Sequence, residues 1–156
     1  MAIRYWQDAL AVDPHFAPAH NALGDALSTK GQTANAIQHW HNALASEPDL
    51  LPAQVNLAWA LATCTQGTLR NGTNAVALAK RANELTSSED PIILKTLAAA
   101  YAETGDFPNA ITAAQQAQQI ATRQQNLPLA NAIERQMELY QSNQPYRETA
   151  TASLYH

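Results

Sequence analysis

Apolar residues recur along the chain with helical spacing, and one arrangement of them appears twice, 34 residues apart. Segments 2–14 and 36–48 carry apolar side chains at positions i, i+1, i+4, i+7 and i+8, with Trp6 and Trp40 in equivalent places. This spacing puts the side chains on one stripe of an α-helix. Each segment closes with a proline, which cannot continue the helix. The recurrence predicts stacked helix pairs of constant length.

Continuing the same register divides the rest of the chain into units. Complete helix pairs are expected over 17–50, 51–89 and 90–122, a capping helix over 128–142, and a half-repeat over 2–14. The half-repeat corresponds only to the second helix of a pair, so either the chain is a fragment of a longer array or the apolar stripe of the half-repeat needs another cover. Residues 144–156 are mostly polar, and we expect a C-terminal tail that is either flexible or docked at the periphery of the domain. The sequence thus predicts one all-α domain over 1–143 with about seven helices.

The second complete unit is longer than the others. Its two helical patterns are separated by five extra residues, which fall in the polar stretch from Cys64 to Gly72. An Asn-Gly pair in this stretch is typical of a turn. We expect Arg70 and Asn71 to brace the loop, and Asn71 or Thr73 to cap the helix that follows.

Composition narrows the range of functions. The chain of 156 residues carries 9 basic and 13 acidic residues, for a net charge of −4, with no basic stripe of the kind that binds nucleic acid. No apolar run has the length of about 20 residues that spans a bilayer, and no signal-peptide pattern begins the chain. We therefore expect a soluble protein of unassigned compartment. Cys64 is the single cysteine, so no intrachain disulfide is expected.

The unit at 17–50 resembles a tetratricopeptide repeat. Leu23, Gly24, Ala36 and Pro48 match the family pattern directly, and His20, Leu27 and Trp40 stand where the family has Trp, Tyr and Phe. Gly24 lacks a side chain where the partner helix crosses most closely. The resemblance implies a right-handed α-solenoid of helix-turn-helix repeats, in which first helices line a concave groove.

The second half is also similar to the C-terminal ends of long bacterial tetratricopeptide proteins. The residues that carry this similarity are Leu57–Cys64, Arg70–Gly72, Ala75–Val76, Leu78–Ala79, Thr96–Glu103 and Pro145–Glu148. Some such proteins have glycosyltransferase-like domains upstream, and no segment of that kind is present in this sequence. The similarity implies a recognition module rather than an activity.

Within the family, the groove binds an extended peptide or a partner helix. The resemblance places a peptide-binding surface at Asn21, Asp25, Ser28, Asn56, Trp59 and Lys95. Asparagine amides suit a peptide backbone because each offers donors and an acceptor. A clamp for a C-terminal carboxylate is not expected, because Asn56 alone matches its residue pattern and Asp25 would repel a carboxylate. Trp59 fits two roles equally well, a binding anchor or a side chain packed against a neighbouring first helix. The register of Trp6 and Trp40 places both indoles between paired helices, where we expect them to fill the core.

Other functional classes are less well supported. His39 and His41 lie two residues apart and point away from each other on a helix, so no metal site is expected. We expect no catalytic constellation and no cofactor. The main alternative is self-association: Ile3 and Trp6 of the half-repeat are left uncovered, which favours a homodimer. A third hypothesis is a regulatory C-terminal module of a larger, glycosyltransferase-linked protein.

Overall fold

The computed structural model describes residues 2–148, and that part of the chain is all-α. It contains eight α-helices, which fall on the half-repeat, the three helix pairs and the capping helix expected from the sequence, and one short 3-10 helix. They are α1 (Ala2–Val12), α2 (Ala17–Thr29), α3 (Thr33–Ser46), α4 (Leu51–Thr63), η1 (Gly67–Leu69), α5 (Gly72–Leu85), α6 (Pro91–Glu103), α7 (Phe107–Arg123) and α8 (Leu127–Gln141).

Local sequence signals explain where the helices begin. Proline stands in the first turn of α2, α4, α6, α7 and α8, where a missing backbone N–H costs nothing. The side chains of Asn71, Asp90, Asp106 and Asn126 each accept a hydrogen bond from a backbone N–H in the helix that follows. Asn71 therefore caps α5, as predicted.

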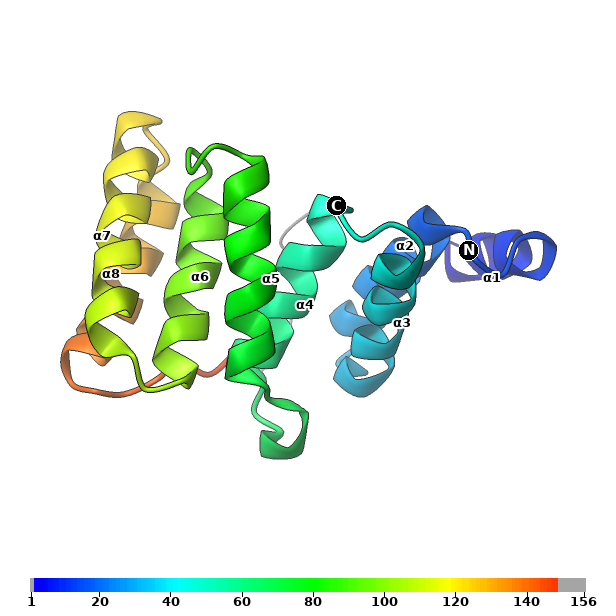
Figure 1. The fold of residues 1–156 in the computed structure, drawn as a ribbon, viewed down its shortest axis with the longest axis horizontal. Coiled ribbons are helices and arrows are strands. Elements are labelled where there is room, and N and C mark those ends of the chain that lie inside the picture. Colours follow the sequence, from blue (N-terminus) through cyan, green and yellow to red (C-terminus); the bar gives the residue numbers. More distant parts are fainter. Residues whose placement is uncertain (1, 149–156) are drawn as a thin grey trace.

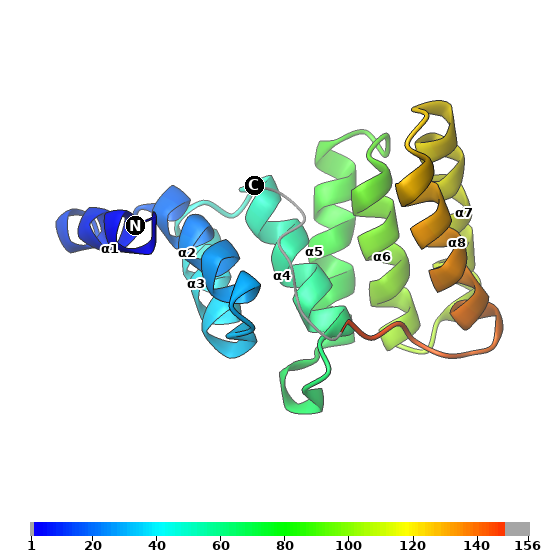
Figure 2. The same ribbon diagram turned by 180° about the vertical axis from the view of Figure 1, so that it is seen from behind.

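Helices α2 to α8 line up in a row in which successive helices run in opposite directions, and α1 lies at one end with its axis turned across theirs (Figure 1). α2 packs on α3, α4 on α5, and α6 on α7, and α8 closes the end of the row against α7. The first helices of successive pairs also contact each other, α2 with α4 and α4 with α6. α4 and α8 lie on the side that Figure 2 turns toward the reader, while α5 and α7 lie on the opposite side.

α4 lies at the centre of the packing. Every residue from Ala53 to Thr63 is buried, so the helix is covered on all sides. Leu57 and Ala60 belong to the main core cluster, and Val55 packs in a separate small cluster with Ala82 and Ile93. Many of the core side chains are alanines, which let neighbouring helices approach closely.

The two repeat-equivalent tryptophans have different surroundings. Trp40 is fully buried, whereas Trp6 is only half-buried, and no residue of α1 is buried. The prediction that both indoles fill a core between paired helices is therefore wrong for Trp6. The physical reason is that α1 packs mainly against α2 in the described part of the chain, so its apolar stripe has a cover on one side only.

Gly24 allows the Trp40 ring to lie directly on the backbone of α2. A Cβ atom at position 24 would lie 2.5 Å from Trp40 Nε1 and 2.6 Å from Cδ1, closer than atoms tolerate. The ring is fully buried and has no room to withdraw. This contact explains the glycine in the first helix of the pair.

Gly24→Ala is expected to lower the free energy of unfolding by about 1 kcal/mol net, because overpacking a rigid site costs roughly 1–3 kcal/mol. That cost exceeds the gain of about 1 kcal/mol from helix propensity. Urea denaturation measures the difference. The double variant Gly24→Ala with Trp40→Leu should lose less stability than the sum of the losses in the two single variants, because the smaller side chain at position 40 leaves room for the methyl group. Strictly additive losses would contradict the steric explanation.

Among residues 2–148, none of the helices combines the length and apolar character that crossing a bilayer requires.

Candidate functional site

The six predicted surface residues separate into two contact groups and one buried residue. The first group joins α2, α3 and α4 around the carboxylate of Asp25. Its Oδ1 atom accepts hydrogen bonds from Trp40 Nε1 at 3.0 Å and Asn56 Nδ2 at 2.9 Å, and Oδ2 accepts one from Asn21 Nδ2 at 3.5 Å. The Oδ1 atom of Asn21 is buried and accepts no hydrogen bond from the described residues.

This first group links the N-terminal helix pair to the rest of the row. Asn56 is 2% exposed, and its amide reaches from α4 to a residue on α2. Asp25 receives donors from three different helices, so the carboxylate fixes their relative positions. The structure thus brings Asn21, Asp25 and Asn56 together around one carboxylate, and a peptide-binding role for these residues stays a prediction.

The second group surrounds Trp59. The ammonium of Lys95, from α6, lies 4.4 Å from the centre of the Trp59 ring. The ring of Tyr146 lies 5.7 Å away on a 40° tilt, and the indole N–H donates a hydrogen bond to the carboxylate of Glu148. Trp59 is consequently only 1% exposed. Its cover is the chain's own C-terminal segment together with Lys95.

Ser28 joins neither description. It is 1% exposed, so its hydroxyl lies inside the packing of α2 rather than on an open surface. The inward register position of Ser28 falls in the last turn of α2, close to where the helix ends at Thr29.

Residues 145–148, which we name the C-terminal segment, run back across the row of helices. After α8 the chain passes the ends of α6 and reaches the end of α4 (Figure 2). The backbone N–H of Glu148 donates to the carbonyl of Thr63 at 2.9 Å, and residue 148 forms a single parallel β-bridge with Cys64. Of the two alternatives for the tail, docking describes residues 145–148, and residues 149–156 lie outside the described part.

Glu103, at the end of α6, anchors both the long loop and the C-terminal segment. Its carboxylate lies 3.0 Å from Arg70 Nε and 2.6 Å from Arg147 Nη2, and the side chain is 14% exposed. Arg70 also donates to the carbonyls of Cys64 at 2.9 Å and Thr65 at 3.3 Å. Arg70 thus braces the loop as predicted, and its ion pair with Glu103 ties the loop to the neighbouring helix α6.

The C-terminal segment covers an area of α4 and α6 that we call the Trp59 surface. It consists of Trp59, Ala62 and Thr63 on α4 and of Lys95 and Glu103 on α6. Sequence reasoning found Trp59 and Lys95 but missed Glu103, whose partner Arg147 stands 44 positions later in the chain. The advance signals were the stretch Thr96–Glu103 and the Pro-Tyr-Arg-Glu string at 145–148, both of which belong to the family resemblance.

Burial shifts the pKa values of Lys95 and Glu148, two oppositely charged groups at this surface, in the directions that favour their neutral forms. Desolvation lowers the pKa of the Lys95 ammonium, and the nearby Glu148 carboxylate opposes that change. Desolvation likewise raises the pKa of Glu148, against the hydrogen bond from Trp59 and the charge of Lys95. Burial therefore disfavours the charged form of both groups.

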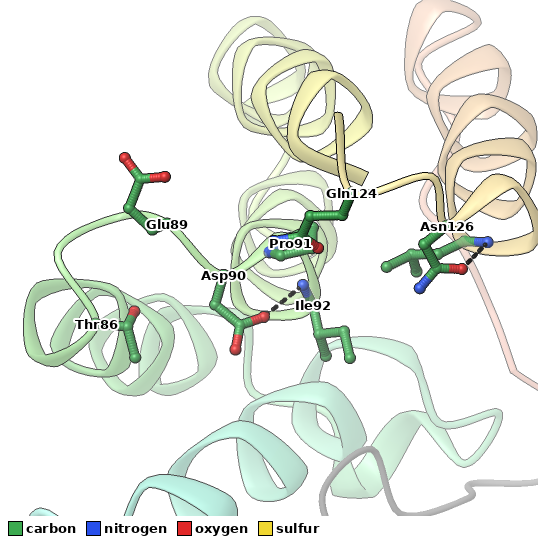
Figure 3. Close-up of a pocket in the computed structure, with 8 residues that line it drawn as sticks. Thr86, Glu89, Asp90, Pro91, Ile92, Gln124 and Asn126 are labelled. Atoms are coloured by element: carbon green, nitrogen blue, oxygen red, sulfur yellow. Dashed lines mark hydrogen bonds between the residues drawn. The ribbon is translucent and has the colours of Figure 1, made fainter. Parts of the chain in front are cut away.

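A separate hollow of about 400 Å³ lies between the start of α6 and the start of α8 (Figure 3). Asp90 points to the backbone N–H of Ile92 at 2.8 Å, and Asn126 to that of Leu129 at 3.3 Å, so both polar side chains act as helix caps. None of the predicted surface residues lines this hollow. In residues 2–148 we find no group of three His, Cys, Asp or Glu side chains arranged to hold a metal ion.

His20 takes the place of the family's tryptophan and forms a pair with His39. The two Nδ1 atoms lie 2.9 Å apart, and His20 Nε2 lies 3.1 Å from the carbonyl oxygen of Pro14. Because a carbonyl can only accept, His20 Nε2 carries a proton and donates it. In the neutral pair, Nδ1 of His20 then accepts from Nδ1–H of His39. A second proton on His20 would place two donors face to face.

Acidification is expected to weaken the fold through this pair. Burial, and then the charge of His20, lower the pKa of His39 below its usual 6.5. The unfolded chain therefore binds a proton at higher pH than the folded chain does, and stability falls as pH decreases through about 6.5. Thermal melts should show a lower melting temperature at pH 5.5 than at pH 7.5, and His39→Gln should make this difference smaller. His41→Gln, an exposed neighbour on the same helix, should leave the decrease unchanged, and an equal effect of both changes would contradict the assignment.

A scan against models of known protein families matches none of them, and a search of curated proteins returns no match. Functional inference therefore rests on the geometry described above.

Proposed function

We propose that this chain is a non-enzymatic protein-interaction module, a right-handed tetratricopeptide-type solenoid that binds an extended segment of a partner protein along its first helices. One observation carries the proposal: the chain's own residues 145–148 lie across α4 and α6 in an extended conformation. A surface that accepts one extended segment through backbone and side-chain contacts has the chemistry to accept another.

The arrangement of helices supports the solenoid. Helix pairs follow one another in a row, with contacts from each first helix to the next and from each second helix to the following first helix. The fully buried Trp40 and the close approach at Gly24 match the roles that the repeat pattern gives those positions. Such stacking lines one face with first helices. On α4 the C-terminal segment covers that face at Trp59, so a partner would take the place of this segment.

The side chains along this face suit a polypeptide ligand. Asn21 and Asp25 present amide and carboxylate groups on α2, while Lys95 and Glu103 present opposite charges on α6. A partner segment would find hydrogen-bonding groups for its backbone and fixed charges for its side chains.

The proposal of no catalytic role draws support from Cys64, the one thiol in the chain. The residue is 2% exposed, and burial raises the pKa of its thiol. A nucleophilic cysteine needs an accessible thiolate with a lowered pKa. Cys64 has the opposite properties and serves as packing at the end of α4.

A peptide library displayed on phage tests the proposed function with the whole chain immobilised. Peptides selected on the native protein should lose binding to Lys95→Glu by at least tenfold. Lys80→Glu is a matched control, because Lys80 also lies over an aromatic ring, 5.7 Å from Tyr101, but is exposed on the second helix α5. Peptides that bind both variants as well as the native protein would place the binding surface elsewhere and overturn the proposal.

A second candidate, self-association through α1, is favoured by a separate observation. Tyr5 is 66% exposed and Val12 is 89% exposed, on a helix with no buried residue. Light scattering on a concentration series should then show a dimer that Tyr5→Glu combined with Val12→Glu dissociates. A monomer at all concentrations up to about 10⁻³ M removes this candidate, since useful protein association falls in or below that range.

A further inference from the structure

We propose that the Trp59 surface recognises one chemical order in a partner segment, an aromatic residue followed by arginine and then by glutamate, and that the chain's own Tyr146–Glu148 is a competing internal ligand. This inference rests on the proposed function and specifies the partner's chemistry. The geometry of three adjacent contacts points to it.

Each of the three side chains contacts a different group on the Trp59 surface. Tyr146 lies against the ring of Trp59, with 5.7 Å between ring centres. Arg147 makes an ion pair with Glu103 at 2.6 Å and donates to the carbonyl of Ala62 at 3.3 Å. Glu148 accepts from the indole N–H of Trp59 on the side where Lys95 lies.

The two charged side chains of the Trp59 surface on α6, Lys95 and Glu103, stand in a fixed order along the helix. Glu103 and Lys95 are eight residues apart, which corresponds to about 12 Å along a helix at 1.5 Å per residue. Consecutive side chains of an extended segment project to opposite sides. The neighbouring residues Arg147 and Glu148 can therefore reach two charged groups that lie this far apart. A segment with glutamate before arginine would set carboxylate against Glu103 and guanidinium against Lys95. Like-charge placement of that kind is how binding surfaces reject the wrong sequence.

The internal segment is held loosely enough to be replaced. Residues 145–148 are each only half-buried, and a single β-bridge joins their backbone to α4. Desolvation works against the charges of both Lys95 and Glu148, so part of the attraction between them is offset. Trp59, in contrast, has almost no exposed surface while the segment lies on it. A partner with the same order of side chains would take over every contact.

Fluorescence anisotropy with a labelled peptide of residues 143–148, Asn-Gln-Pro-Tyr-Arg-Glu, tests the inference directly. The protein is used as the full chain, native or with Arg147→Ala and Glu148→Ala together, which weakens the internal ligand. The peptide should bind the double variant at least tenfold more tightly than the native chain, because internal occupancy reduces apparent affinity by the fraction of open sites. A control peptide with the last two residues exchanged should bind neither protein.

A charge exchange keeps the test independent of the stability of the double variant. Introducing Lys95→Glu into the double variant should abolish binding of the original peptide and restore binding of a peptide whose final glutamate is replaced by lysine. Equal binding of the original and exchanged-order peptides, or no binding to any variant, overturns the inference. A dimer of the native chain that the peptide dissociates would give the site to a second copy, and would also overturn the assignment to a separate partner.

The two levels of the proposal fail separately. If library peptides respond to Lys95→Glu but lack the aromatic-arginine-glutamate order, the interaction surface stands and the inferred recognition order is wrong. If no peptide responds to Lys95→Glu, the proposed function itself is overturned.

Discussion

Trp40→Ala is expected to lower the free energy of unfolding by about 3–5 kcal/mol, the usual cost of truncating a fully buried tryptophan. The indole is 0% exposed, fills the space above Gly24 and donates a hydrogen bond to Asp25. The substitution leaves a cavity and removes one of the donors to a carboxylate that joins three helices. Urea denaturation followed by circular dichroism measures the loss.

Trp6→Ala is the matched control, because Trp6 holds the equivalent position 34 residues earlier. Trp6 is only half-buried, so its removal should cost less than about half as much, in proportion to the apolar surface it hides. Equal losses in the two variants would show that the repeat positions are energetically equivalent. That result would contradict the packing described for α1.

Glu103→Gln is expected to destabilise the chain by about 2–3 kcal/mol. The carboxylate, 14% exposed, meets two arginines, and its loss leaves both guanidinium groups without their counter-charge. The amide keeps the shape of the side chain, so the effect reports charge rather than packing. Chemical denaturation gives the free-energy change.

Limited trypsin digestion adds a second measurement for the same variant. Cleavage after Arg147 should accelerate, because this residue then loses its ion pair and the segment is held by weaker contacts. Glu138→Gln, an exposed acid on α8, is the control and should change neither measurement. Unchanged digestion of Glu103→Gln would show that the ion pair does not hold the C-terminal segment.

Local sequence signals predicted most of the helices. The spacing around Trp40, the glycine at position 24 and the cap at Asn71 all depend on residues within one or two turns, and each has the predicted surroundings. Such short-range patterns are set by helix geometry and need no knowledge of distant parts of the chain.

The failures share one physical cause, dependence on distant contacts. Whether Trp6 is buried depends on what packs against α1, which its own sequence does not encode. The cover of Trp59 comes from Glu148, 89 positions away, and the anchor for Arg147 is Glu103. A polar segment with a proline has few local signals of order, so contacts made by three of its side chains could not be foreseen from composition.

The account also explains why the inward face offers little open surface in the isolated chain. Asn21, Asp25 and Asn56 are engaged with one another, and Trp59 is covered. Binding of a partner along α4 and α6 therefore requires the exchange of an internal contact for an external one. An interaction of this kind is expected to be weaker in the native chain than in a variant with a weakened C-terminal segment.

The indole N–H signals of the three tryptophans provide the most direct test, because each indole reports a different place: the half-repeat, the core and the Trp59 surface. In a nitrogen-15 correlation spectrum of the native chain, titration with a peptide selected from the library should shift the Trp59 indole signal, whose hydrogen bond to Glu148 is replaced. The Trp6 signal should stay in place. A shift of Trp6 with Trp59 unchanged would put the interaction on α1 and contradict the central claim that the first helices bind the partner.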